Sequence, residues 1–288
     1  MFAAAFNYYR AGSLAEAGDL LRQYPGAKLL AGGHSLIPLL KLRLAAPPAL
    51  VDIGRIAELK GVTVKDGVAR IGALTTHAEI ATSSVVRDHC PALGEAARLI
   101  GDPAVRNRGT IGGNVAHADP ASDLPTVLTA LGARFVISAS GSTKTSDAAS
   151  FFTGMMTTAL GEHDLLVAVE VPVRQKGQGQ AYVKFSHPAS RYAVIGVAAT
   201  LVASGGKCTA ASVTLGGLVP KALRASAVEK ALAGQTLSPD TIAKAASQVT
   251  SDLGGEILGD VFASARYRKA TAPVWVKRAL AAAADRAK

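Results

Sequence analysis

The chain has 288 residues, 49% of them hydrophobic, so it can bury a large core in one large domain or two medium ones. Its formal net charge is +10, but the lysines and arginines are scattered, with few aromatic residues among them, which argues against nucleic-acid binding. The two cysteines, Cys90 and Cys208, stand far apart. Neither a disulfide nor an iron–sulfur cluster held by this chain alone is therefore expected.

Neither a membrane span nor a secretion signal is expected from the sequence. The longest apolar run in the C-terminal half covers residues 193–203, well short of the roughly 20 apolar residues that a membrane helix needs. The first ten residues lack a basic region ahead of an apolar core. These features predict a cytoplasmic protein.

The first 57 residues are predicted to form a small unit of strands and helices. Ser13 and Glu16 have the spacing of a capping box, and apolar residues recur behind them at helical spacing, which predicts a helix over 13–24. Short strands are predicted at 28–31 and 49–53, and each runs into glycine.

A second lobe is predicted to begin with a β-hairpin. Strand-like residues at 62–64 and 68–72 flank Asp66-Gly67, a pair that supports the positive φ of a tight turn. Further along, the pattern predicts helices near 76–82, 91–100 and 123–131, a glycine-rich loop between the last two, and strands at 133–139 and 165–171.

A domain boundary is predicted near residue 175, because residues 174–180 are polar and contain glycine, as a linker or a long hairpin turn does. Beyond it, strands are predicted at 181–185, 194–202 and 208–215, and helices at 222–233, 239–250 and 274–286. The whole chain is therefore predicted to be α+β, with strands followed by helices in its C-terminal part.

Two glycine pairs are the main candidates for a functional site. Gly32-Gly33 follows a predicted strand and precedes His34 and Ser35, and Gly112-Gly113 lies between Thr110 and Asn114. Glycine lets the backbone approach a ligand closely and turn several N–H groups toward one point, which suits a pyrophosphate. Either pair alone is most often only a tight turn.

Other nucleotide and metal motifs are absent. No GxGxxG follows a strand, and a P-loop ending at Gly206-Lys207 would need glycine where Leu201 stands. His117, Asp119 and Asp123 lie close in sequence, but their spacing matches no strong ligand pattern, so a loop and helix-cap role is expected for them. No metal site and no catalytic residue is predicted in this chain.

The combination of the two pairs resembles a known family. The sequence AGGHS at 31–35, TIGGN at 110–114 and then Asp123 in HADPASDLP is similar to the FAD-binding subunits of the molybdenum hydroxylases. The nearest patterns are the medium subunit of aerobic carbon monoxide dehydrogenase and the flavin domain of xanthine dehydrogenase. The resemblance covers essentially the whole chain.

The resemblance implies which residues contact FAD. It implies a first pyrophosphate loop at Leu29, Leu30, Ala31, Gly32, Gly33, His34, Ser35 and Leu36, and a second at Thr110, Ile111, Gly112, Gly113 and Asn114. It further implies single contacts at Ile100, Asp123, Leu166, Lys184 and Tyr192, with Tyr192 against the isoalloxazine. The family often has an acidic residue where Arg191 stands, which puts the field at the flavin and the electron acceptor in question.

The resemblance also implies the fold. It is a two-lobed FAD-binding domain of the vanillyl-alcohol-oxidase (PCMH) type over residues 1–175, with lobes of about 1–57 and 58–175. A smaller α+β domain of the carbon monoxide dehydrogenase flavoprotein type then covers 176–288. His34 is expected to lie near non-covalently bound FAD, because the family does not attach its flavin.

The function implied is electron transfer inside a larger enzyme. Its large subunit carries the molybdenum cofactor and its small subunit two [2Fe-2S] clusters, in a dimer of heterotrimers, and FAD passes the electrons to an external acceptor. A four-iron cluster in this chain is not expected, because two cysteines cannot supply four thiolates. A self-sufficient flavin oxidase and a non-catalytic flavin-binding protein remain alternatives.

Overall fold

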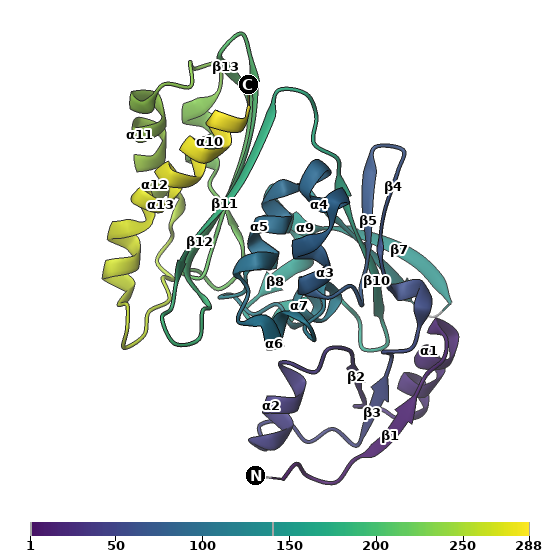
Figure 1. The fold of residues 1–288 in the computed structure, drawn as a ribbon. Helices are drawn as coiled ribbons and strands as arrows, with labels where there is room; N and C mark the ends of the chain where they lie inside the picture. Colours follow the sequence, from purple (N-terminus) through teal and green to yellow (C-terminus); the bar gives the residue numbers. More distant parts are fainter. Residues whose placement is uncertain (1, 140, 288) are drawn as a thin grey trace.

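The computed structural model describes residues 2–139 and 141–287 and has three lobes in chain order (Figure 1). The N-terminal lobe holds a parallel sheet in the order β1-β3-β2 and two helices. Its elements are β1 (Asn7–Arg10), α1 (Leu14–Gln23), β2 (Lys28–Leu30), α2 (Leu36–Lys41) and β3 (Ala49–Asp52). The helix predicted at 13–24 and the strands predicted at 28–31 and 49–53 are thus confirmed, whereas β1 was not predicted.

Helix α1 begins where the sequence indicates, but its cap differs in one detail. Ser13 accepts a hydrogen bond from the Glu16 N–H, as a capping box requires, while the Glu16 carboxylate accepts from Gly12 rather than from Ser13. Ala17 and Leu21 lie on the buried face of the helix and pack into the core of this lobe. The cap and the apolar face together fix the helix against the sheet.

The middle lobe is built on an antiparallel sheet in the order β4-β5-β10-β6-β7. The predicted hairpin is confirmed, with positive φ at Asp66 and Gly67 in its turn. The elements are η1 (Ala57–Leu59), β4 (Val62–Lys65), β5 (Val68–Gly72), α3 (His77–Thr82), α4 (Ser84–His89), α5 (Pro91–Leu99), α6 (Pro103–Arg106), α7 (Ile111–His117), α8 (Asp123–Ala130), β6 (Arg134–Ala139), β7 (Ser142–Asp147), α9 (Ala148–Phe151), β8 (Phe152–Gly154), β9 (Thr157–Thr158) and β10 (Leu165–Pro172).

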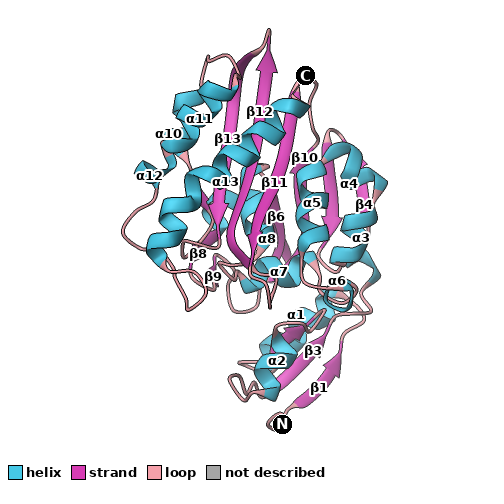
Figure 2. Cartoon of the chain, turned by 60° about the vertical axis from the view of Figure 1, so that its left-hand side comes forward, coloured by secondary structure: helices cyan, strands magenta, loops and turns pink. Residues whose placement is uncertain are grey.

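The C-terminal lobe has a four-stranded antiparallel sheet in the order β11-β12-β13-β14. Helix α13 packs on one side of β11 and β12, and α5 and α8 of the middle lobe pack on the other (Figures 1 and 2). Its elements are β11 (Gln178–Ser186), β12 (Ala193–Ser204), β13 (Lys207–Gly216), β14 (Leu223–Arg224), α10 (Ser226–Leu232), α11 (Pro239–Ser247), α12 (Val249–Asp252) and α13 (Ala265–Arg286).

Three groups of buried apolar residues correspond to the three lobes, and two of them join neighbouring lobes. Tyr182 and Ala198 of the C-terminal sheet are buried in the core of the middle lobe, and Leu165 of β10 is buried in the core of the N-terminal lobe. The lobes are therefore packed on one another. The expected α+β class is confirmed, and none of the described helices is both long and apolar enough to cross a membrane.

Three predicted elements were wrong in their extent. The helix predicted at 222–233 begins only at Ser226, because Leu223 and Arg224 pair with β13 as strand β14. Helix α13 begins at Ala265, well before the predicted 274, because Pro273 is accommodated inside it rather than ending the chain of helical turns before it. The glycine-rich loop predicted before residue 123 is the first turn of α7, since Thr110 caps this helix by accepting from the Gly113 N–H.

Candidate functional site

A cavity of about 880 Å³ extends between the N-terminal and middle lobes as far as the loop at Tyr192. It is lined by the segment after β2, by the start of α7, and by Ile100, Leu166 and Tyr192. Its volume falls in the range of cavities that bind organic cofactors. The site is therefore formed by segments far apart in sequence, which only the packed lobes bring together.

The first glycine pair leaves its backbone donors available. Gly33 has φ of +76°, a conformation that other residues rarely adopt, and a side chain on Gly32 would collide with the carbonyl oxygen of Arg108. Within the part of the chain that the structure describes, no hydrogen bond is donated by the N–H groups of residues 32–35. Consecutive unused amides next to a cavity can bind an anionic group such as a diphosphate.

The second glycine pair works differently, and its predicted nest of free amides is wrong. The N–H of Ile111 donates to Thr75, that of Gly112 to Ala73, and that of Gly113 to the hydroxyl of Thr110. Gly112 is needed for close packing, because a Cβ there would lie 2.6 Å from the Cβ of Ala73. The helix start is thus anchored to the segment between β5 and α3, and few of its backbone N–H groups are free to bind a ligand in the cavity.

At the start of α7, side chains rather than backbone N–H groups are the hydrogen-bond donors available to a ligand. Asn114 lines the cavity, and its Oδ1 accepts a hydrogen bond of 2.6 Å from the hydroxyl of Ser122, which leaves its amide N–H groups for a ligand. Thr110 also lines the cavity, and its hydroxyl proton is not used by the helix cap, which needs only the oxygen. Both side chains can therefore donate to an acceptor in the cavity.

Ile100, Leu166 and Tyr192 give the cavity apolar and aromatic walls. Ile100 is held there by Arg106, whose guanidinium donates to the carbonyl oxygens of Ile100 at 2.9 Å and Gly101 at 3.3 Å. These two bonds occupy the Arg106 guanidinium in positioning the loop. Leu166 lines the cavity from β10. Such surfaces suit the faces of a flat ring system.

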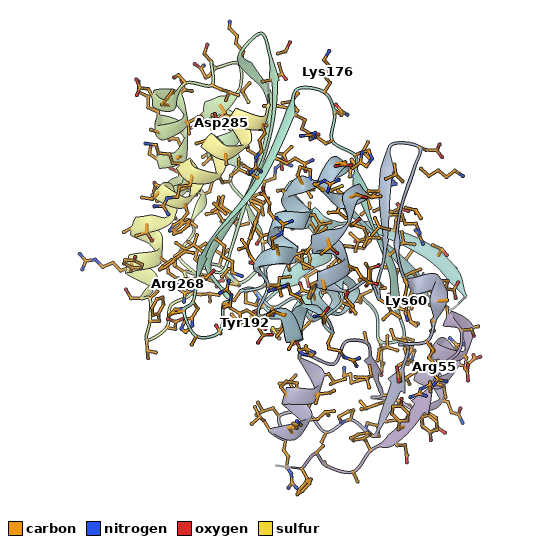
Figure 3. The ribbon with its side chains drawn as sticks, viewed as in Figure 1. Arg55, Lys60, Lys176, Tyr192, Arg268 and Asp285 are labelled. Carbon is orange, nitrogen blue, oxygen red and sulfur yellow. The ribbon has the colours of Figure 1, made fainter. Side chains whose placement is uncertain are left out.

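Tyr192 lies at the lower end of the C-terminal lobe, beside the middle lobe (Figure 3). It closes a tight loop, because its carbonyl accepts from the His187 N–H at 2.8 Å, and Arg191 before it adopts φ of +60°. Burial, with smaller contributions from the charges of Asp119 and Asp123, raises the pKa of the Tyr192 phenol, so it is neutral at physiological pH. A neutral phenol ring at this place can cover a flat cofactor.

Asp123 and Lys184 form a buried ion pair between the middle and C-terminal lobes. The Lys184 ammonium lies 2.9 Å from the Asp123 carboxylate and donates at 3.0 Å to the carbonyl of Leu99, and the Tyr182 hydroxyl donates at 2.5 Å to the same carboxylate. Burial raises the pKa of Asp123, and its two donors offset part of that increase. The pair fixes the carboxylate at the edge of the cavity.

The structure brings most of the expected residues together around this cavity. Among the residues proposed from the family resemblance, Leu30, Ile111 and Lys184 do not line it, and Arg191 does. The cavity is also lined by residues that the sequence did not single out as cofactor contacts, among them Lys28, His77, Gly101, Gly109, His117, Ser122, Leu160, Glu162 and Asp164. His77 could not be found from the sequence, because no motif around it indicates burial in a cavity.

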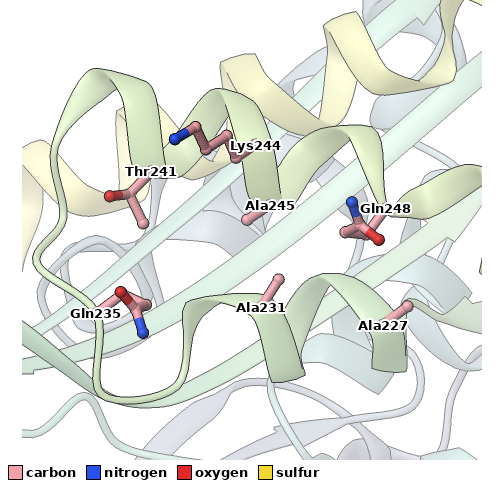
Figure 4. Close-up of a pocket in the computed structure, with 7 residues that line it drawn as sticks. All are labelled: Ala227, Ala231, Gln235, Thr241, Lys244, Ala245 and Gln248. Carbon is pink, nitrogen blue, oxygen red and sulfur yellow. The ribbon is translucent and has the colours of Figure 1, made fainter.

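A metal site and a second pocket are the two other candidates for a functional site, and neither has suitable side chains in the described part of the chain. Among the described residues no group of histidine, cysteine and carboxylate side chains could hold a metal ion, and Asp119 instead accepts from the Ala121 N–H in a local turn. A second pocket of about 300 Å³ lies between α10 and α11 and is lined mainly by alanines and neutral polar side chains (Figure 4). It has no cluster of groups suited to a cofactor.

Comparison with known proteins identifies the family. Residues 4–174 match the FAD-binding domain of molybdopterin dehydrogenases, and residues 180–283 match the C-terminal domain of carbon monoxide dehydrogenase flavoproteins. The chain is 38% identical to the carbon monoxide dehydrogenase medium chain of Hydrogenophaga pseudoflava, over 98% of each chain. It is also 38% identical to the glyceraldehyde dehydrogenase medium chain of Sulfolobus acidocaldarius, over 97% of this chain and 98% of the other.

A solved structure agrees with this identification along the whole chain. The carbon monoxide dehydrogenase from Hydrogenophaga pseudoflava that lacks the Mo-pyranopterin moiety of its cofactor contains a chain with 40% identity and a TM-score of 0.95, over 99% of both chains. The chain belongs to the FAD-binding medium subunits of the molybdenum hydroxylases.

Proposed function

We propose that this chain binds FAD without a covalent bond and transfers electrons within a molybdenum hydroxylase. In this assembly a large subunit carries the molybdenum cofactor, a small subunit carries two [2Fe-2S] clusters, and two such heterotrimers associate in the cytoplasm. FAD supplies the redox chemistry. The chain receives electrons from the small subunit and passes them, through the flavin, to an external acceptor.

The observation that carries the proposal is the chemistry of the cavity of about 880 Å³. The first glycine loop offers unused amides for a diphosphate, and Ile100, Leu166 and Tyr192 offer apolar and aromatic surface for a ring system. These two kinds of surface match a dinucleotide, which has a charged diphosphate in its middle and a flat ring system at its end. The chain itself contributes placement and environment to the flavin.

The proposal assigns specific contacts to the residues around the cavity. Gly32, Gly33, His34 and Ser35 hold the diphosphate, and Thr110 and Asn114 donate to it or to the adjoining ribityl chain. Asp123 bonds the flavin at the ring end, with Lys184 and Tyr182 fixing its carboxylate. We also propose a division of labour in which residues 1–57 and 58–175 form the two lobes of the FAD domain and residues 176–288 cover the ring end.

The substrate of the whole enzyme is not assigned to this chain. Its relatives named for carbon monoxide and for glyceraldehyde are each 38% identical to it, so overall identity does not favour either substrate. This is what a subunit without the substrate-binding site should show. The specificity then resides on the molybdenum-bearing chain.

Purification of the chain alone and with its genetically neighbouring subunits tests the proposal. The chain should contain one FAD per polypeptide, and acid precipitation should leave the yellow chromophore in the supernatant. Hydroxylase activity should require the two other subunits. Substrate oxidation by the chain alone would support a self-sufficient oxidase instead, and a chain that binds FAD but adds nothing to the activity of the other subunits would indicate a non-catalytic flavin-binding protein.

A further inference from the structure

A buried histidine in the cavity has no partner in the protein. His77 is the first residue of α3, only 3% of it is exposed, and it lines the cavity. Its Nδ1 is fully buried without a hydrogen-bond partner, and among the described residues no hydrogen bond to its Nε2 is found either. Nε2, in contrast, is not fully buried, so it is the ring nitrogen open to the cavity. A largely buried polar ring with neither nitrogen bonded is costly to a folded protein, and a ligand in the cavity can supply a partner for Nε2.

The chain is built closely around this ring. The backbone N–H of His77 donates to the carbonyl of Gly109 at 3.0 Å, and a Cβ on Gly109 would lie 2.8 Å from the imidazole Cδ2 and 2.9 Å from its Nε2. Glycine at position 109 is therefore what leaves room for the imidazole. Packing explains the position of the ring, but a phenyl ring would pack as well, so packing does not explain why this residue is a histidine.

The location of His77 indicates which part of a ligand it meets. Gly109 contacts the glycine loop as well, since a Cβ on Gly32 would lie 3.0 Å from the Gly109 Cα. Thr110, the next residue, also lines the cavity. The imidazole thus lies close to the glycine loop with the unused amides.

The charge state of the ring suits a hydrogen-bond donor. Burial, and to a smaller extent the nearby His34, lowers the pKa of His77 to about 4, so the imidazole is neutral at physiological pH and has one N–H and one lone pair. Phosphate oxygens accept hydrogen bonds and donate none. The N–H is therefore the group that a diphosphate can use.

From these contacts we propose that His77 is a cofactor-binding residue that donates a hydrogen bond from its imidazole to the diphosphate of FAD. The proposal rests on the FAD site described above and adds a side-chain donor to the backbone amides of the glycine loop. The donor is Nε2, because Nδ1 is fully buried and out of reach of a ligand in the cavity. The same residue also holds the segment before α7, because its backbone N–H donates to Gly109.

The test is FAD binding to the full chain freed of flavin, followed by flavin fluorescence. His77→Phe keeps a flat ring but has no donor, and it should bind FAD about 10- to 100-fold more weakly, as expected for loss of a hydrogen bond to a charged group. His77→Gln restores an N–H and should recover part of the affinity. His77→Ala gives the same comparison if the phenyl ring disturbs the packing against Gly109.

Two controls separate this proposal from a structural role and from the FAD site itself. Thr200→Val removes another buried, unpartnered polar atom that lies outside the cavity, and it should leave FAD affinity unchanged. Riboflavin lacks the diphosphate, so its binding should be the same in wild type and His77→Phe. Wild-type FAD affinity in folded His77→Phe and His77→Ala, or an equal loss for riboflavin, would overturn the role of His77, whereas a wild-type chain that binds no FAD would overturn the proposed function.

Discussion

Gly32-Gly33 and Gly112-Gly113 both line the cavity, but they contribute to it in different ways. The first pair leaves consecutive N–H groups unused and includes a residue at positive φ, whereas the second begins a helix whose first N–H groups all have partners within the chain. The same dipeptide thus provides donors for a ligand in one place and close packing in the other. Whether a glycine matters for binding or for folding depends on what its backbone already contacts.

Gly112→Val should have the largest effect, and the effect should be on folding. The added side chain would begin 2.6 Å from the Cβ and 2.7 Å from the carbonyl oxygen of Ala73, neither of which is the end of a flexible side chain. We expect the free energy of unfolding to fall by about 3 kcal/mol or more. Urea unfolding measures it, and unchanged stability would show that α7 can move away from Ala73 without cost.

Gly33→Val should affect binding more than folding. Positive φ is unfavourable for valine, and the side chain would press on Ile37 and displace the loop that carries the unused amides. We expect FAD affinity to fall by at least about 100-fold, about 3 kcal/mol, with native circular dichroism. Gly113→Ala is the matched control, because Gly113 has no positive φ and its Cβ would meet only Thr110 Oγ1 at 3.0 Å. Equal flavin content in both variants would contradict the comparison.

The sequence predicted the first loop better than the second for a physical reason. A strand followed by Gly32-Gly33 is a local pattern, and the local chain determines its conformation. The second pair depends on Ala73 and Thr75, whose carbonyls bind the start of α7 from a distant segment. No local pattern records such a contact, so the sequence alone suggested two equivalent loops.

The same distinction explains the other differences between expectation and structure. Strand β1 is mostly exposed and is held by parallel pairing with β3, about 40 residues away, so no apolar alternation marks it in the sequence. His77 is buried by the packing of Gly109 and was not recognised for the same reason. Elements with their own caps and apolar faces, such as α1, were found with nearly correct ends.

The histidine between the two glycine segments predicts a pH dependence of stability in the flavin-free chain. Its pKa is lowered to about 4 in the folded state, while an unfolded histidine titrates near 6.5. Between these values the unfolded chain binds the extra proton, so stability should fall as pH decreases from about 6.5 to about 4. The difference between these two pKa values corresponds to about 3 kcal/mol.

His77→Phe should remove that part of the pH dependence, and urea unfolding at several pH values measures it. Carboxylates with lowered pKa, such as Asp52 and Asp164, lose their stabilising contribution mainly as pH falls below their ordinary value of 3.8, so they act outside this range. Superimposable stability profiles for wild type and His77→Phe would contradict the assignment of a buried neutral imidazole.

The smallest expected effects concern Tyr192 and Arg191, which line the cavity and which we propose to lie near the flavin ring. Tyr192 is 44% exposed, so Tyr192→Ala should open one face of the flavin to dioxygen and small dyes without emptying the site. Oxidation of the reduced complex by these acceptors should become faster. Stopped-flow measurement of flavin reoxidation checks this, with FAD content as the control.

Arg191 tests whether a charge next to Tyr192 affects the flavin. A cation near the ring stabilises the anionic reduced form, so Arg191→Asp should lower the flavin potential. Reversing a unit charge at about 8 Å in water changes the interaction by about 1 kcal/mol, or about 20 mV for a two-electron couple. Arg191 lines the cavity but is also exposed, and salt screens exposed charges, so the shift should shrink at high ionic strength. A redox titration of the assembled complex at low and high salt decides it: equal potentials for wild type and Arg191→Asp at low salt would mean that the arginine does not affect the flavin.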